Sequence, residues 1–118
     1  MRVAREEKPA LPELARIERR RLAGKEFASP AVIDLHGLRQ DEAYRALAQF
    51  IARARAKGHG TVLVVTGKGS AQRESVLRAN VPRWLAEHEF KSQILAISPA
   101  HSAHGGDGAF YLRLRKLR

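Results

Sequence analysis

Residues 31–66 read AVIDLHGLRQDEAYRALAQFIARARAKGHGTVLVVT and hold two apolar runs on either side of a helix-like segment. AVIDL at 31–35 is a short β-branched run, and TVLVVT at 61–66 is a continuous apolar run typical of a strand buried on both faces. Between them, residues 41–57 place small and apolar side chains at helical spacing, with polar ones left for solvent. Strand, helix and strand in this order predict two parallel strands joined by a right-handed crossover.

The rest of the chain extends this pattern. Residues 73–88 predict a second helix, and Pro82 within it predicts a kink or a break near Val81. QILAIS at 93–98 predicts a third strand. AFYLRLR at 109–115 alternates in polarity, which predicts a half-exposed fourth strand antiparallel to the third. The fold class expected is α/β: a two-layer sandwich of a mixed four-stranded sheet, in the order β-α-β-α-β-β, with two main helices.

Residues 1–30 differ from the remainder of the chain because they are rich in charge and contain few large apolar side chains. We interpret them as a charged N-terminal arm, with a helix from Pro12 to Lys25. The helix could be simply solvated, or the arm could contact nucleic acid. Residues 31–118 then form the folded domain.

The chain has 118 residues, room for one domain and an arm, and its 22 lysines and arginines against 12 acidic residues give a formal charge of +10. This surplus predicts a polyanionic partner, and nucleic acid is favoured over a membrane because no strongly apolar helix face accompanies the charge. The lack of cysteine excludes a disulfide framework and a thiolate zinc site. No apolar run approaches the roughly 18 residues that span a bilayer, and no signal peptide is evident, so we expect a cytoplasmic protein.

Polar and glycine-rich segments follow each of the first three predicted strands. They are DLHG at 34–37, TGKG at 66–69 and HSAHGGDG at 101–108. If the three strands are parallel, these segments gather at one edge of the sheet, where open α/β sheets place their ligand sites. The sequence therefore predicts one composite site.

Asp34 and His36 are two residues apart, so on an extended strand their side chains share a face, and the carboxylate can orient the imidazole as a general base or acid. The alternative is a structural pair that caps the next helix. Gly67, Lys68 and Gly69 would offer backbone N–H groups and one ammonium to an anion. The glycine spacing and Lys-[Ser/Thr] ending of a nucleotide-binding P-loop are absent, and the alternative interpretation is an ordinary turn.

Other residues of the predicted edge carry weaker signals. His101 and His104 could join Asp34 and His36 in a metal set, although we assign no metal ligand. Glycines in the third segment would let the backbone approach a phosphate. The phosphate-binding candidates there and on the rim, each of which could equally be a surface residue, are His101, Gly105, Gly106, Arg39, Arg73, Arg78, Arg113 and Arg115.

Taken together, DLHG at 34–37, TGKG at 66–69, VPRWL at 81–85 and HGGDGA at 104–109 with YLRLR at 111–115 resemble the small MutS-related (Smr) domain. The resemblance covers residues 31–116 and is closest to the stand-alone bacterial proteins, which carry a charged N-terminal extension. The family's Asp-x-His motif falls on Asp34 and His36, and its glycine-rich motif on 67–69. Many relatives have histidine where this chain has Thr66, so the division of labour among the remaining histidines and Lys68 stays open.

The resemblance implies an endonuclease that cuts RNA or structured DNA, with the ribosome as a further partner. On RNA, the expected catalytic residues are Asp34, His36, Lys68 and His104, and no cofactor is required. On DNA, which has no 2′-hydroxyl, a divalent metal at Asp34 becomes attractive. The alternative is a non-catalytic module that only binds DNA, RNA or the ribosome. We expect a monomer.

Overall fold

The computed structural model describes residues 31–69, 75–101 and 106–117, so the arm predicted at 1–30 lies outside the described residues. Along the chain the elements are β1 (Ala31–Asp34), α2 (Gln40–Ala56), β2 (Thr61–Val65), α3 (Val76–Leu85), α4 (His88–Lys91), β3 (Ile94–Pro99), the 3-10 helix η4 (Gly106–Gly108) and β4 (Ala109–Leu114). The predicted succession of strands and helices is confirmed, with the short α4 and η4 in addition.

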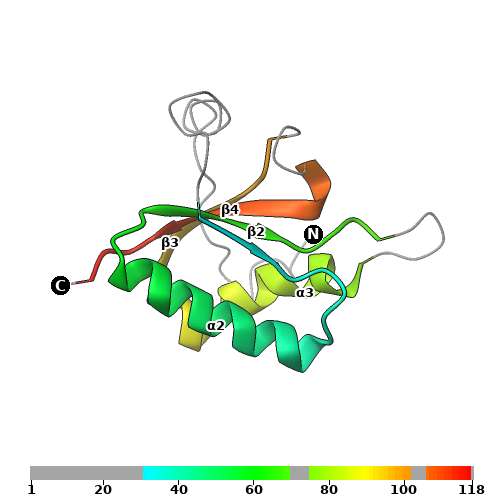
Figure 1. Ribbon diagram of the computed structural model, residues 1–118, viewed down its shortest axis with the longest axis horizontal. Helices are drawn as coiled ribbons and strands as arrows, with labels where there is room; N and C mark the ends of the chain where they lie inside the picture. The colour runs from blue at the N-terminus through cyan, green and yellow to red at the C-terminus, as the bar shows by residue number, and fades with distance from the viewer. Residues whose placement is uncertain (1–30, 70–74, 102–105, 118) are drawn as a thin grey trace, which may run out of the picture.

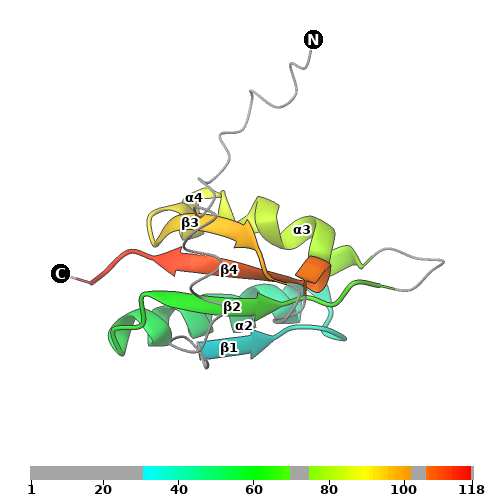
Figure 2. The ribbon, with the colours of Figure 1, turned by 90° about the horizontal axis from the view of Figure 1, so that it is seen from above.

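The sheet has the strand order β1-β2-β4-β3, so the last strand lies between the second and the third (Figure 2). β1 pairs with β2 in parallel, while β4 is antiparallel to both β2 and β3. β1, β2 and β3 therefore all run in one direction, and their carboxyl ends lie at one edge together with the start of β4. The mixed sheet and the antiparallel last strand are confirmed.

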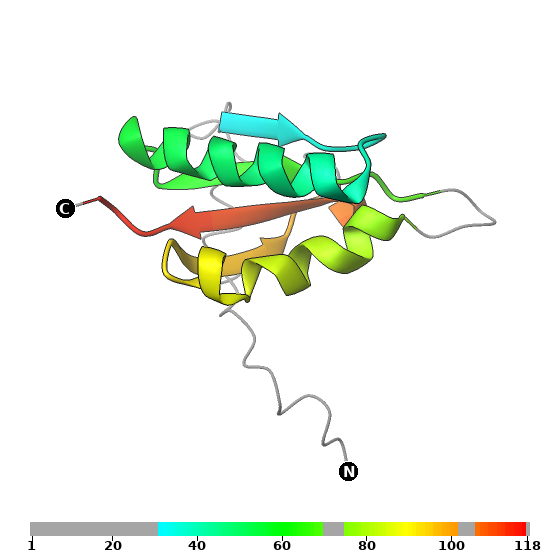
Figure 3. The same cartoon turned by 90° about the horizontal axis from the view of Figure 1, so that it is seen from below.

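Both long helices cover the same face of the sheet (Figures 1 and 3). α2 buries Ala43, Leu47, Ile51 and Ala54 at the helical spacing seen in the sequence. They meet Val62 and Val64 of β2, Leu112 and Leu114 of β4, and the apolar side of α3 in one core cluster. This two-layer arrangement is the predicted sandwich, and it leaves the strand ends free to carry loops.

The opposite face of the sheet is also apolar. Leu63, Ala96 and Tyr111 belong to a second buried cluster there, and Tyr111 is fully buried. The prediction of a half-exposed fourth strand is therefore wrong. β4 is an interior strand flanked by β2 and β3, and an interior strand presents less surface to water than an edge strand does.

The second helix begins at Val76 and runs through Pro82 to Leu85, so of the expected kink or break near Val81 the break does not occur. Ser75 caps it by accepting a hydrogen bond from the Arg78 N–H at 3.2 Å. Pro82 removes one backbone donor, but Val81, Trp84 and Leu85 on either side of it are buried, and their packing holds the last turn in place.

Candidate active site

The three polar segments predicted from the sequence meet at the carboxyl edge of the sheet. The Leu35 N–H donates to the Val65 carbonyl at 2.7 Å, which holds the end of β1 beside the end of β2. The N–H groups of Thr66 and Gly67 both donate to the Gly108 carbonyl, at 2.8 and 3.0 Å. Backbone hydrogen bonds thus join all three segments. Their meeting at one edge is what the parallel direction of the first three strands predicted.

Asp34 and His36 form a hydrogen-bonded pair at this edge. His36 Nδ1 lies 2.8 Å from Asp34 Oδ1, and the His36 backbone N–H donates to the same oxygen at 3.0 Å. These bonds to the carboxylate hold the pKa of Asp34 below its usual value of 3.8, so Asp34 is charged at neutral pH. In the tautomer that carries its proton on Nδ1, the ring donates to Asp34 and leaves Nε2 as a proton acceptor.

The pair is open to a ligand. The side chains are 53% exposed for Asp34 and 70% for His36, which leaves Nε2 room to meet a large substrate. The alternative role as a helix cap is not used, because α2 begins after Arg39, whose N–H donates to the Glu42 carboxylate at 3.0 Å. Asp34 instead binds the backbone N–H and the ring of His36 in its own loop.

The TGKG segment owes its shape to two glycines in the left-handed region. Gly67 has φ +86° and Gly69 has φ +88°, and residues that carry a side chain rarely adopt these values. A Cβ on Gly67 would lie 3.3 Å from the Cβ of His36, so the two loops touch. The Gly67 N–H is already engaged by Gly108, so Gly67 contributes conformation and contact, whereas the exposed Lys68 supplies the positive charge.

Thr66 and Ser75 support this loop from beneath. Thr66 is buried, and its hydroxyl lies 3.2 Å from the Gly67 carbonyl oxygen and 3.3 Å from that of Gly108. The Ser75 hydroxyl lies 3.4 Å from the Thr66 carbonyl oxygen while it caps α3. Sequence reasoning assigned Ser75 no role, although a serine that directly precedes a helical apolar pattern is the usual signal of a cap.

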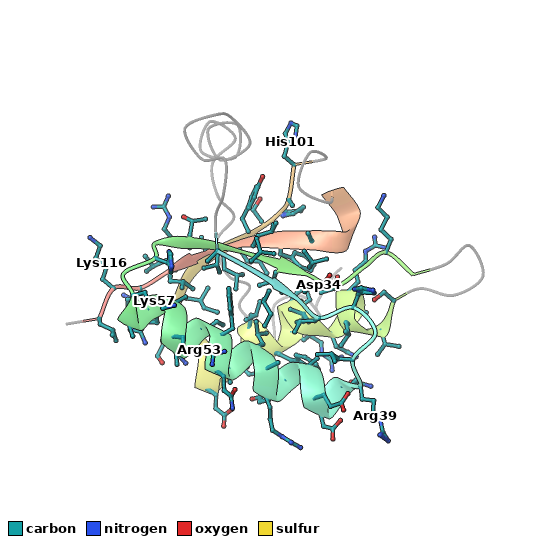
Figure 4. All side chains as sticks on the ribbon, viewed as in Figure 1. Asp34, Arg39, Arg53, Lys57, His101 and Lys116 are labelled. Carbon is teal, nitrogen blue, oxygen red and sulfur yellow. The ribbon has the colours of Figure 1, made fainter. Side chains whose placement is uncertain are left out.

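The remaining candidates divide into three groups. Arg78 follows the cap in the first turn of α3 and so stays near the TGKG segment, and Gly106 begins η4. His101 projects from the side of the sheet that faces away from the helices, and Figure 4 separates it clearly from Asp34. Those outside the described residues are Arg73, His104 and Gly105.

Arg113 does not belong to this edge. It pairs with Thr61 at the start of β2, and four residues of strand, about 13 Å, separate that position from Val65. The reason is the direction of β4, which begins at the site and carries its later residues away from it. The assignment of Arg113 to the phosphate rim is therefore corrected.

Metal-ligand clusters and membrane-spanning helices are both absent from the described part of the chain. In the described ranges, no group of three or more His, Cys, Asp or Glu side chains could hold a metal ion. Asp34 and His36 could contribute to a metal site only if a further ligand came from elsewhere, such as substrate.

The same ranges contain no helix that is both long and apolar enough to cross a membrane.

Comparison with known proteins agrees with this architecture. Residues 33–115 match the family model of the Smr domain. The chain is 32% identical over 105 residues to the ribosome rescue factor SmrB of Vibrio cholerae. The aligned region covers 89% of this chain and 53% of that protein. The chain thus spans about half the length of the curated relatives it matches.

Solved structures show the same fold. YdaL, a stand-alone small MutS-related protein from Escherichia coli, superposes with a TM-score of 0.64 at 34% identity, covering 73% of this chain and 65% of YdaL. The Smr domain of Thermus thermophilus MutS2 gives a TM-score of 0.61 at 28% identity, covering 72% of this chain and 98% of that domain. A two-layer α/β domain with a mixed four-stranded sheet is the fold that this chain shares with both Smr structures. The chain belongs to the Smr domain family.

Proposed function

We propose that the protein is an endonuclease that cleaves phosphodiester bonds of RNA at the Asp34–His36 edge. The observation that carries the proposal is the oriented imidazole: a charged carboxylate holds Nδ1 of His36 at 2.8 Å, and the loop that presents Lys68 lies against the same histidine. An acceptor nitrogen next to a loop that carries a positive charge suits a reaction in which a proton leaves a hydroxyl while negative charge develops on phosphate.

In this mechanism Nε2 of His36 takes the proton from a ribose 2′-hydroxyl, and the 2′-oxygen forms a new bond to the adjacent phosphorus. Asp34 stabilises the imidazolium that results, as it holds the ring. Lys68 and the Gly69 N–H stabilise the added charge on the phosphate oxygens. The bond from phosphorus to the 5′-oxygen breaks, and His104 protonates that oxygen. The products are a 2′,3′-cyclic phosphate and a 5′-hydroxyl end, and no cofactor takes part.

A second candidate function is a non-catalytic nucleic-acid-binding module. The observation that favours it is the exposure of the pair, since general acid–base sites are stronger where water is excluded. If the substrate were DNA, water would have to attack, and a divalent metal bound through Asp34 would supply Lewis-acid chemistry.

The relatives suggest where such an enzyme acts. The Vibrio cholerae protein is named as a ribosome rescue factor, and this chain carries a charge of +10. We therefore propose RNA on the ribosome as the natural substrate, in the cytoplasm, with the protein acting as a monomer. A substrate held by the ribosome would itself help to exclude water from the exposed pair.

The test is cleavage of end-labelled single-stranded RNA, with magnesium and with EDTA, by the native protein and by His36→Ala. Loss of a general base lowers the rate by about 10² to 10⁴. The matched control is Gln49→Ala, an exposed position in the middle of α2, which should cleave normally.

Cyclic-phosphate ends formed in EDTA and lost in His36→Ala would support the mechanism. Unchanged cleavage by a folded His36→Ala protein would refute it, and magnesium-dependent nicking of DNA alone would refute the choice of RNA. Parallel assays with purified ribosomes carrying messenger RNA identify an activity that needs its natural substrate. Binding without turnover in all of them would favour the second candidate.

A further inference from the structure

A second charged surface lies at the opposite end of the sheet from Asp34. The last turn of α2, the turn before β2 and the residues after β4 surround a cleft of about 350 Å³. We call it the basic cleft, and its lining residues are Arg55, Ala56, Lys57, Gly58, His59, Arg115, Lys116 and Leu117. Figure 4 shows Lys57 and Lys116 at this end of the molecule, well away from Asp34.

The charge in the basic cleft is not balanced by the residues that line it. Arg55, Lys57, Arg115 and Lys116 bring four formal positive charges, and no aspartate or glutamate is among the lining residues. The carboxyl end of a helix supplies only about half a negative charge, so the end of α2 offsets a small part of this excess. A site with this charge fits a ligand that carries several negative charges.

Two of these side chains are held in place by neutral groups. Arg55 Nε donates to the Arg115 carbonyl at 2.7 Å, and Arg115 Nε donates to the Ser92 carbonyl at 3.1 Å. An arginine has five N–H donors, so both guanidinium groups keep donors for a ligand while their orientation is set by the backbone. Lys57 and Lys116 are exposed beside them. Oriented guanidinium groups flanked by exposed ammonium groups are suited to phosphate.

The position of the basic cleft relates it to the candidate active site. Gly60 precedes β2 and Thr66 follows it, so about 20 Å of extended chain separates the two ends. At the roughly 3.4 Å of rise per nucleotide of a stacked B-form strand, this distance corresponds to about six nucleotides, and a more extended single strand spans it with fewer. One polynucleotide can therefore reach both ends of the sheet, whereas a dinucleotide cannot.

We infer that the basic cleft binds the phosphate backbone of the same RNA strand whose scissile bond lies at the Asp34–His36 edge, several nucleotides away. This inference rests on the proposed function, because it takes RNA as the ligand of that edge. It assigns substrate recognition to two separated regions: one for chemistry, and one that adds affinity without base specificity.

The test is the binding of a fluorescent single-stranded RNA of about twenty nucleotides, measured against salt concentration. The variant is Lys57→Gln with Lys116→Gln, which leaves the two backbone-bound arginines in place. The control is Arg45→Gln with Arg83→Gln, the same change in charge at exposed positions of α2 and α3. Thermal unfolding of both variants verifies that they are folded.

Each phosphate contact to a single strand contributes about 0.7 to the salt slope, so the cleft variant should lose about 1.4 while the control keeps its slope. When the salt concentration rises fourfold, the native protein should lose about sevenfold more affinity than the cleft variant, so the difference in affinity between the two shrinks by that factor. Binding of a dinucleotide should not change. An unchanged slope in the cleft variant, or an equal loss in the control, would overturn the inference.

Cleavage measured on the same proteins separates this inference from the proposed function. If the cleft variant cleaves a dinucleotide normally but needs more of the long RNA to reach half its maximal rate, both proposals hold. If none of the proteins cleaves RNA but the salt slope of the cleft variant is still reduced, the catalytic proposal is refuted and RNA binding by the basic cleft is supported. If all the proteins cleave and bind RNA alike, RNA binding by the basic cleft is refuted and the catalytic proposal is supported.

Discussion

Gly108 links the start of β4 to the TGKG segment, and its replacement by alanine should displace the loop that presents Lys68. A Cβ at this position would lie 3.0 Å from the carbonyl carbon of Gly67 and 3.1 Å from the backbone nitrogen of Lys68. Both neighbours are backbone atoms, which cannot rotate aside as the end of a side chain does. The loop or the strand must therefore move by about 0.4 Å to restore an ordinary contact of 3.4 Å.

That movement acts on the bonds that hold the site together. The Gly108 carbonyl accepts the N–H groups of Thr66 and Gly67, and overpacking of this kind costs about 1–3 kcal/mol of stability. A displacement of about 1 Å at a catalytic group can lower a rate by about 10², so a shift of several tenths of an ångström should lower RNA cleavage by about tenfold. RNA affinity should fall less, because the basic cleft is untouched.

The assay combines urea denaturation with single-turnover cleavage for Gly108→Ala and for the control Gly60→Ala. A Cβ on Gly60 would meet nothing within 4 Å, and its φ lies outside the left-handed region, so this variant should unfold and cleave like the native protein. If Gly108→Ala matches Gly60→Ala in both measurements, the close contact does not control the loop and the reasoning is wrong.

Three further predictions concern stability and pH. Asp34→Asn should lower the cleavage rate by about 10² or more because His36 loses its charged partner. Since the pKa of Asp34 in the native protein lies below 3.8, the ionised carboxylate stabilises the fold above that pH. Urea denaturation should therefore show that the difference in stability between the native protein and Asp34→Asn closes as pH falls through the lowered pKa. Tyr44→Phe keeps its ring contacts but loses the 2.5 Å bond to Glu89, which should cost about 1–2 kcal/mol at pH 8. This bond raises the pKa of Tyr44 from 10.0 to about 12, so the difference should persist to about pH 10 and shrink as pH rises through 12; a constant difference would contradict it. Leu112→Ala, at a fully buried core position, should cost about 2–5 kcal/mol in the same assay.

Much of the site followed from local sequence because its parts lie where elements end. The apolar runs and the helical spacing of residues 41–57 predicted two parallel strands and a crossover, and this rule placed the DLHG and TGKG segments side by side. The Asp-x-His spacing likewise predicted that Asp34 could hold the His36 ring, and the 2.8 Å contact agrees. These inferences needed only the period of the pattern and the handedness of the connection.

Other features depended on pairings between residues far apart in the chain. The insertion of β4 between β2 and β3 pairs Thr61 with Arg113, and no local period encodes which strand neighbours which. This pairing buries Tyr111, carries Arg113 away from the site and brings the Gly108 carbonyl to the TGKG segment, where it engages the Gly67 N–H that had been expected to bind phosphate.

Local patterns of residues were therefore enough to predict the helices and strands, the fold class and the polar side chains available at one edge of the sheet. These features depend on neighbouring residues and on the geometry of a single crossover. The strand order, the support of the TGKG segment by Gly108, and the cleft formed by lysines and arginines at the ends of α2 and β4 could be seen only in the folded chain. Those features arise because sheet pairing joins segments separated by dozens of residues, and the free energy of that pairing belongs to the assembled core rather than to any one segment.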